Sequence, residues 1–243
     1  MPSSRSRQAE LARLAERPFA HRGLHGGGRI ENSRAAYEAA IDNRFGIELD
    51  VQATADGFAC VFHDEDLGRL TDQQGWLRDR TLAEVGKIRL RGSAEAIPSL
   101  VEILGLIAGR VPLLIEVKAE RSDYRPLCEG VARDLQGYDG PVGIMGFDPR
   151  VARWFSRRYP DFLRGMVVTE SGKRGLRGQI ERSLSSLCSR ADFLAYDIRD
   201  LPSSFASARR ARGVPVYTWT VRSDADRARA AAHADQIIFE MPA

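Results

Sequence analysis

Two acidic residues stand in a segment that otherwise has the composition of a buried β-strand. Glu48 and Asp50 alternate with Ile47, Leu49 and Val51. Residues two apart in an extended strand point to the same face, so both carboxylates look into one space. Like charges on a buried face each raise the cost of ionising the other, and a hard divalent cation with oxygen ligands relieves that cost. The alternative is a solvated edge strand whose polar residues face water.

A histidine follows this strand at a distance that a hairpin would close. Asp56-Gly57 is a tight-turn dipeptide, so the apolar residues 58–62 are expected to double back beside the first strand. The hairpin then delivers His63 close to the carboxylates. An imidazole takes or gives a proton near neutral pH. The segment therefore predicts acid–base chemistry beside a metal site.

Composition limits the classes of protein to which the chain can belong. Its 243 residues, 43% hydrophobic and 28% charged, fit one globular domain, which we expect to span residues 1–243. The net charge of +3 is spread along the chain, which argues against a nucleic-acid partner. We therefore expect a small-molecule partner; nothing in the sequence fixes the oligomeric state.

The cysteines and the apolar stretches indicate where the protein works. Three widely spaced cysteines are an odd number, typical of a reducing compartment. Residues 1–17 carry four arginines and no apolar run, unlike a secretory signal. The apolar region 100–117 is interrupted by Glu102, Arg110 and Glu116, which argues against membrane insertion. We expect a cytoplasmic protein.

Strand and helix patterns alternate along the chain, and they predict an α/β fold. Such alternation implies right-handed crossovers and a parallel sheet, and eight units at this length favour a closed (β/α)8 TIM barrel. Residues 64–96 are polar and are expected to form a small insertion after the second strand. The predicted strands are 19–22, the Glu48 segment, 111–117, 142–147, 163–168, 193–196, 214–221 and 236–239.

Helices are expected between these strands. Asn32 or Ser33 caps the first of them, which runs through Ile41. The chain stops four residues after the last strand, so we expect no eighth helix and place an N-terminal helix, 8–16, near the seam. The other helices are predicted at 98–107, 124–135, 150–158, 178–188, 204–212 and 225–232, with a short helical piece at 81–85.

Reactive groups in such barrels lie at the C-terminal ends of the strands. Glu116 and Lys118 repeat the spacing of Glu48 and Asp50, so a third carboxylate is expected to reach the same cavity. Agreement among several strands favours a metal site over a solvated edge strand. The polar residues at these positions are His21, Arg22, Glu48, Asp50, Glu116, Lys118, Asp148, Asp197 and Trp219.

An ordered series of motifs resembles the glycerophosphodiester phosphodiesterase family. It extends from residue 20 to the end of the chain and is densest before residue 120. The series comprises His21-Arg22-Gly23, Glu31-Asn32, Glu48-Leu49-Asp50-Val51, Thr54-Ala55-Asp56-Gly57, His63-Asp64, Arg69-Leu70-Thr71, Gly75, Ile97-Pro98-Ser99-Leu100, Ile115-Glu116-Val117-Lys118 and Tyr217-Thr218-Trp219-Thr220. The family fold is the same barrel that the alternation predicts.

The resemblance implies a chemistry and a set of roles. It implies that Glu48, Asp50 and Glu116 hold one divalent cation, Mg²⁺ or Ca²⁺, and that His21 and His63 are the acid–base pair. In the family scheme the glycerol C2 hydroxyl attacks phosphorus, the other alcohol departs, and water opens the cyclic phosphate. We expect His21 to be the base and His63 the acid. The expected products are glycerol 3-phosphate and a free alcohol.

Several neighbouring residues are expected to help bind the substrate. Arg22 and Lys118 are candidate donors to the phosphate, although Lys118 has an alternative role as the structural partner of Glu116. Trp219 either fills the top of the barrel or forms a wall against the substrate. Asn32 joins the substrate-binding candidates without a defined role. His25 is expected to be a surface or lid residue outside the site.

Two departures from the family pattern stand out. Ile30 replaces the proline that commonly precedes Glu-Asn, and Glu240 stands where the family tends to have an aspartate. The tips of the later strands, which would contact the alcohol, are also unusual, so the leaving alcohol is not defined. Two other functions stay open: a lysophospholipase D-like or sugar-phosphate diester hydrolase, and a phosphodiester-binding protein without turnover.

Overall fold

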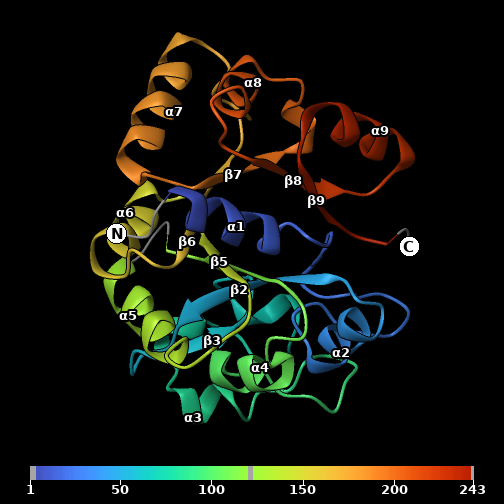
Figure 1. Ribbon diagram of the computed structural model, residues 1–243. Coiled ribbons are helices and arrows are strands. Elements are labelled where there is room, and N and C mark those ends of the chain that lie inside the picture. Colours follow the sequence, from blue (N-terminus) through green and yellow to red (C-terminus); the bar gives the residue numbers. More distant parts are fainter. Residues whose placement is uncertain (1–3, 120–122, 242–243) are drawn as a thin grey trace.

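The computed structural model describes residues 4–119 and 123–241, and within them eight parallel strands close into a barrel (Figure 1). The first strand pairs with both the last strand and the second, which completes the ring. The predicted TIM barrel is confirmed. The strands of the ring are β1 (Phe19–His21), β2 (Gly46–Ala53), β4 (Leu113–Val117), β5 (Val142–Met145), β6 (Leu163–Val168), β7 (Phe193–Asp197), β8 (Val216–Val221) and β9 (Gln236–Phe239).

Most helices cover the outside of the ring, and capping side chains set the start of several of them. Ser33, rather than Asn32, caps α2 by accepting a hydrogen bond from Ala36 N. Ser99 and Glu102 form a capping box at α4. The helices are α1 (Ser4–Leu14), α2 (Arg34–Asp42), α3 (Leu82–Val85), α4 (Leu100–Ile107), α5 (Tyr124–Asp134), α6 (Pro149–Arg158), α7 (Leu176–Ser189), α8 (Ser204–Arg210) and α9 (Asp224–His233).

Alternation along each strand divides the apolar residues into two cores. Ile47, Leu49 and Val51 point outward and pack with the helices. A separate cluster fills the barrel interior and contains Phe19, Leu114, Met145, Leu163, Val167, Phe193, Ala195, Tyr217 and Ile238. Because adjacent residues of a strand face opposite ways, the polar residues between the outward-facing ones are forced into the barrel.

The N-terminal helix, which we expect near the seam between the last and first strands, has its end there, because Gln236 Nε2 of β9 donates to Ala15 O at 2.7 Å. Leu14, at the end of α1, is fully buried in the interior cluster. Arg7 bonds Asp192 just before β7, with Nη2 to Oδ2 at 2.7 Å. In Figure 1, α1 crosses the middle of the molecule, with β7–β9 on one side and β2 on the other. The helix covers the end of the barrel at which the strands begin, where Leu14 is fully removed from water.

The expected hairpin is confirmed. Strand β3 (Ala59–Val61) runs antiparallel to β2, with Val61 opposite Val51. The segment after it forms the short turns η1 (Leu67–Arg69) and η2 (Leu77–Asp79) and the helix α3. These pieces pack on β3 through a small core of their own, which comprises Cys60, Phe62, Leu67, Leu77, Val85, Leu90 and Ile97. No helix in the described part of the chain has the length and apolar content needed to cross a bilayer.

Candidate active site

Strand register brings three carboxylates together inside the barrel. Asp50 of β2 lies beside Glu116 of β4, and Glu48 of β2 lies beside His21 of β1. One oxygen from each of Glu48, Asp50 and Glu116 lies within 4.8 Å of the others, and all three residues are buried. The prediction that Glu116 reaches the same cavity is confirmed. The solvated edge strand is excluded, since β2 is paired on both sides and buried.

The electrostatics of this cluster suit a bound cation. Burial raises the pKa of Glu48 well above its usual value, and the charges of Asp50 and Glu116 raise it further. Glu48 Oε1 is buried and has no hydrogen-bond partner. Three converging carboxylates, one of which has an oxygen without a hydrogen-bond partner, are suitable ligands for a hard divalent ion. The cluster could therefore bind an ion.

Two cations partly balance the carboxylates. Lys118 Nζ lies 2.5 Å from Glu116 Oε1 and 3.1 Å from Asp50 Oδ1. Arg22 donates its backbone N–H to Glu48 Oε2 at 3.0 Å, and its Nε lies 3.2 Å from Asp50 Oδ2. Burial alone would raise the pKa of Asp50, but Lys118 and Arg22 outweigh it and lower that pKa. Lys118 is thus a partner of the acids and also lines the cavity above them.

His21 is held by a carboxylate from the end of the chain. Its Nδ1 lies 2.6 Å from Glu240 Oε1, and its Nε2 lies 3.9 Å from Glu48 Oε2. Arg222 in turn donates from Nε and Nη2 to the two oxygens of Glu240, at 2.6 and 2.9 Å. Burial lowers the pKa of His21, and the hydrogen bond that its Nδ1–H donates to Glu240 offsets part of that effect. The lowered pKa favours the neutral ring, which can accept a proton.

His63 has a partner of the same kind from its own segment. Its Nδ1 lies 2.6 Å from Asp64 Oδ1. Asp64 also bonds Arg69, whose Nη2 reaches Glu31 Oε1 at 2.7 Å. The His63 side chain is 29% exposed, against 11% for His21. The two histidines line the same cavity and come from different chain segments. His21 is buried, whereas His63 is partly open to water.

The cavity that these groups share has a volume of about 470 Å³. Phe147 and Trp219 form an aromatic edge on it, with ring centroids 5.8 Å apart at 87°. Trp219 Nε1 donates to Ala195 O at 2.9 Å, which fixes the indole as a wall of the cavity. A second cavity of about 700 Å³ continues past His63, Lys118 and Phe147, and Pro126 and Arg78 also line it.

Asn32 lies beneath the site rather than on its surface. Its Nδ2 donates to Asp50 Oδ2 at 3.0 Å, and its Oδ1 accepts from Tyr37 at 2.7 Å. The residue is 1% exposed. Its side-chain amide thus bonds protein groups on both ends. This placement favours orientation of Asp50 over the direct substrate contact that we expected.

Two of the other strand-end acids serve local structure. Asp148 caps α6 through Arg150 N at 2.8 Å. Asp197 lines the cavity but accepts from Arg199 N at 2.9 Å and bonds its guanidinium.

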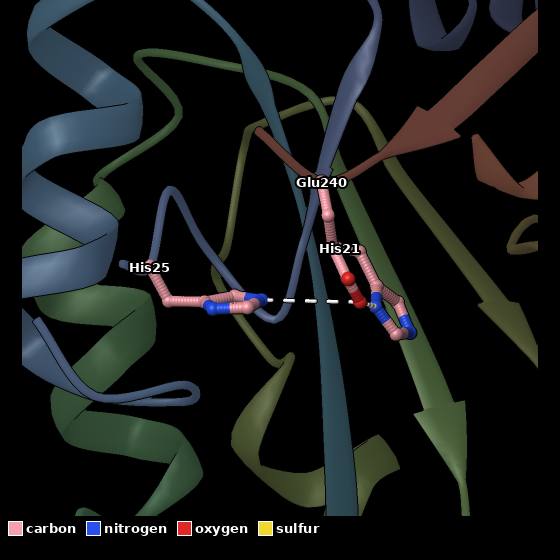
Figure 2. A group of neighbouring side chains, drawn as sticks. All are labelled: His21, His25 and Glu240. Atoms are coloured by element: carbon pink, nitrogen blue, oxygen red, sulfur yellow. Dashed lines mark hydrogen bonds and ion pairs between the residues drawn. The ribbon is translucent and has the colours of Figure 1, made fainter. Parts of the chain in front are cut away.

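Sequence reasoning missed three neighbours of the histidines. Asp64 follows His63 directly, so the motif itself contained that signal. Glu240 was noted only as a departure from the family pattern. His25 is less remote than expected, because its Nε2 lies 3.9 Å from Glu240 Oε1. Figure 2 shows His25 and His21 on either side of Glu240.

Comparison with known proteins places the chain among phosphodiesterases. The family model described as "Glycerophosphoryl diester phosphodiesterase family" matches residues 21–242. A glycerophosphodiester phosphodiesterase of Bacillus altitudinis is 40% identical over 114 residues, which cover 44% of this chain and 46% of the relative. One of Caldanaerobacter subterraneus is 29% identical over 223 residues, which cover 87% and 89%.

Solved structures share the fold. An Oleispira antarctica phosphodiesterase, solved with the product sn-glycerol-3-phosphate, has a TM-score of 0.79 and 21% identity, and the match covers 91% of both chains. A putative glycerophosphoryl diester phosphodiesterase from Silicibacter pomeroyi also has a TM-score of 0.79, with 22% identity, covering 96% of this chain and 94% of that one.

Proposed function

The chain belongs to the glycerophosphoryl diester phosphodiesterase family, and we propose that it hydrolyses glycerophosphodiesters to glycerol 3-phosphate and an alcohol. One observation carries this proposal. A single cavity is lined by two histidines and by acids of the buried cluster, with Lys118 and Arg22 beside them. A phosphodiester is an anion that resists attack, and its cleavage needs both charge compensation and two proton transfers.

Glu48, Asp50 and Glu116 would hold the divalent cation. Their all-oxygen donor set suits Mg²⁺ or Ca²⁺. Glu48 Oε1, which has no hydrogen-bond partner, is available to coordinate the ion. A bound cation supplies positive charge to the non-bridging oxygens of the phosphate. Asn32 fixes the orientation of Asp50 through the bond to Oδ2.

His21 acts as the base. Its Nδ1–H donates to Glu240, which leaves Nε2 unprotonated and directed toward the cavity. The lowered pKa keeps this nitrogen free at neutral pH. Nε2 takes the proton of the glycerol C2 hydroxyl as that oxygen attacks phosphorus, and Glu240 stabilises the imidazolium that forms.

His63 acts as the acid. In its protonated form, Nδ1–H donates to Asp64 and Nε2–H is available to the departing alcohol oxygen. The alcohol leaves with that proton, and a cyclic phosphate remains. In the second half of the reaction, His63 takes a proton from the attacking water. His21 returns its proton to the C2 oxygen, which restores the starting state of both rings.

The remaining residues bind and orient the substrate. Arg22 and Lys118 place positive charge beside the carboxylates and contact the phosphate. Phe147 and Trp219 provide an apolar wall for the glycerol or the head group. We also propose that residues 1–243 form one catalytic domain, with residues 64–96 as its insertion, and that it works in the cytoplasm, where the free cysteines stay reduced.

Turnover by the purified protein tests the function. We expect the protein with Mg²⁺ or Ca²⁺ to convert members of a panel of glycerophosphodiesters to glycerol 3-phosphate. Phosphorus NMR measures this product. Chelation with EDTA should abolish turnover, and the variants His21→Ala, His63→Ala and Glu116→Gln should each lower it at least about a hundredfold without altering the circular dichroism spectrum. Tight ligand binding with no product at high enzyme concentration would instead identify a binding protein.

The second cavity favours one alternative substrate class. Its 700 Å³ beside His63 lies in the range of cavities that hold larger organic ligands, so a lysophospholipase D-like activity on lysophospholipids is the second candidate. Including lysophosphatidylcholine in the same panel separates the two. A higher kcat/KM for the lysophospholipid than for glycerophosphocholine would favour the second candidate.

A further inference from the structure

A second group of metal-ligating side chains lies next to the acidic cluster. His21 and His25 each offer a ring nitrogen and Glu240 a carboxylate oxygen, and these atoms lie within 4.8 Å of one another (Figure 2). The carboxylate stands between the two imidazoles. It contacts His21 Nδ1 at 2.6 Å, whereas His25 Nε2 lies 3.9 Å away. His25 has no part in the mechanism described above.

The nitrogen of His25 lacks a partner. Nε2 is buried and forms no hydrogen bond, since 3.9 Å from Glu240 is too long for one. The loop is fixed locally, because the backbone N–H of His25 donates to Gly23 O at 2.9 Å. A buried nitrogen without a partner costs free energy, and a metal ion would satisfy it.

The donor set differs in kind from the acidic cluster. Glu48, Asp50 and Glu116 provide only oxygens, which suit hard ions. Two imidazoles with one carboxylate are a zinc-type set, because imidazole nitrogen binds borderline-soft ions well. We propose that His21, His25 and Glu240 form a second, inhibitory site for zinc and similar transition-metal ions. The inhibition rests on the proposed function, whereas the metal binding does not.

Only small movements are needed. Zinc binds nitrogen and carboxylate oxygen at about 2.0–2.2 Å in tetrahedral geometry, which sets ligand atoms roughly 3.4 Å apart. Glu240 and His21 would separate by less than 1 Å from their present 2.6 Å, and His25 would approach from 3.9 Å. Arg222, which bonds both oxygens of Glu240, competes with the metal. We therefore expect micromolar rather than nanomolar affinity.

Zinc at this site would disable the base. The metal takes the place of the proton on His21 Nδ1 and separates Nδ1 from Glu240. The positive charge lowers the affinity of Nε2 for a proton, so His21 no longer accepts one from the C2 hydroxyl. Zinc should inhibit even when Mg²⁺ or Ca²⁺ saturates the acidic cluster.

The test compares wild type with His25→Gln, and with His233→Gln as a control at the end of α9. Zinc binding is measured by isothermal titration calorimetry in saturating Mg²⁺, and cobalt binding by its visible absorption. We expect wild type and His233→Gln to bind one zinc. His25→Gln should lose at least about tenfold in affinity, together with the cobalt spectrum, and Glu240→Gln should lose binding as well.

Inhibition provides the second readout. Zinc should inhibit wild type over the concentration range in which it binds. In His25→Gln the zinc concentration that halves turnover should rise by the same factor as the dissociation constant, while turnover without zinc stays unchanged. Two results would overturn the proposal. One is an unaltered zinc affinity in His25→Gln, and the other is competition between Mg²⁺ and zinc for the same site. If the protein lacks diesterase turnover, calorimetry and cobalt absorption still decide whether the metal site exists.

Discussion

His21 and His63 have the same arrangement of partners, a carboxylate and then an arginine, but these partners come from different parts of the chain. In each, Nδ1 contacts a carboxylate at 2.6 Å, and an arginine holds that carboxylate from behind. On one side the series is His21, Glu240 and Arg222. On the other it is His63, Asp64 and Arg69.

The surroundings of the two sites differ. The His21 site is assembled from opposite ends of the chain and is buried. The His63 site comes from one hairpin and the turn after it, and water reaches it. Burial lowers the pKa of His21, which suits a proton acceptor. We therefore expect similar hydrogen bonds to support different roles in the proposed mechanism, because solvent access differs between the two histidines.

The largest effect should come from removing either imidazole. His21→Ala and His63→Ala should each lower kcat by about 10²–10⁴, the usual contribution of a general acid or base. A nitrophenyl ester of glycerol phosphate separates the roles, because nitrophenolate leaves without a proton. We expect single-turnover release of nitrophenolate to be rescued in His63→Ala but not in His21→Ala, since His63 is still needed as a base in the second half of the reaction. Rescue of His21→Ala alone would exchange the two roles.

Replacing the carboxylates by amides should give unequal losses. In Glu240→Gln the side-chain amide can donate to Nδ1 and stabilise the tautomer whose Nε2 carries the proton, so we expect kcat to fall by about 10²–10⁴. In Asp64→Asn the amide oxygen still accepts from protonated His63, so a loss of about tenfold is expected. Steady-state kinetics on both variants measures the difference. Equal losses would argue against distinct roles.

The acidic limb of the pH profile reports on the buried site. Because the pKa of His21 is lowered, the fall of kcat/KM toward acid should lie below the ordinary histidine pKa of about 6.5. The hydrogen bond that His21 donates to Glu240 raises that pKa, so Glu240→Gln should move the limb to still lower pH. A limb that moves to higher pH would contradict the assigned pairing.

The smallest effects are expected at the arginines. Both are substantially exposed, and exposed ion pairs contribute about 0–1 kcal/mol. Arg222→Ala should lower kcat/KM less than about fivefold. Arg69→Ala should cost more, because Arg69 also bonds Glu31, which holds Arg22. The kinetics of the two variants, compared side by side, test that order.

Local patterns were sufficient to predict much of the site. Glu48 and Asp50 share a face because strand residues two apart do so, and Glu116 repeats the pattern in the neighbouring parallel strand. The turn at Asp56-Gly57 brought β3 back beside β2 as expected. Each of these relations depends on a few neighbouring residues, so one sequence carries enough information to define it.

Other relations depend on closure of the ring. Ala20 of β1 lies beside Phe239 of β9, so the next residue on each strand is His21 on one side and Glu240 on the other. These two residues are 219 positions apart. No local pattern encodes that register, because packing of the whole barrel interior sets it. Only the folded barrel likewise buries Leu14 in the interior and sets the side-chain amide of Asn32 against Asp50.

The sequence alone determined the alternating strands and helices, the inward direction of the acids and the family motifs, because each follows from backbone periodicity or from a short run of residues. Only the tertiary structure decided which carboxylate holds His21, which end of the barrel the first helix closes, and that His25 lies beside Glu240. Those contacts join segments that meet only when the barrel closes. The free energy that holds these segments together comes from packing of the whole core rather than from the contacting residues alone.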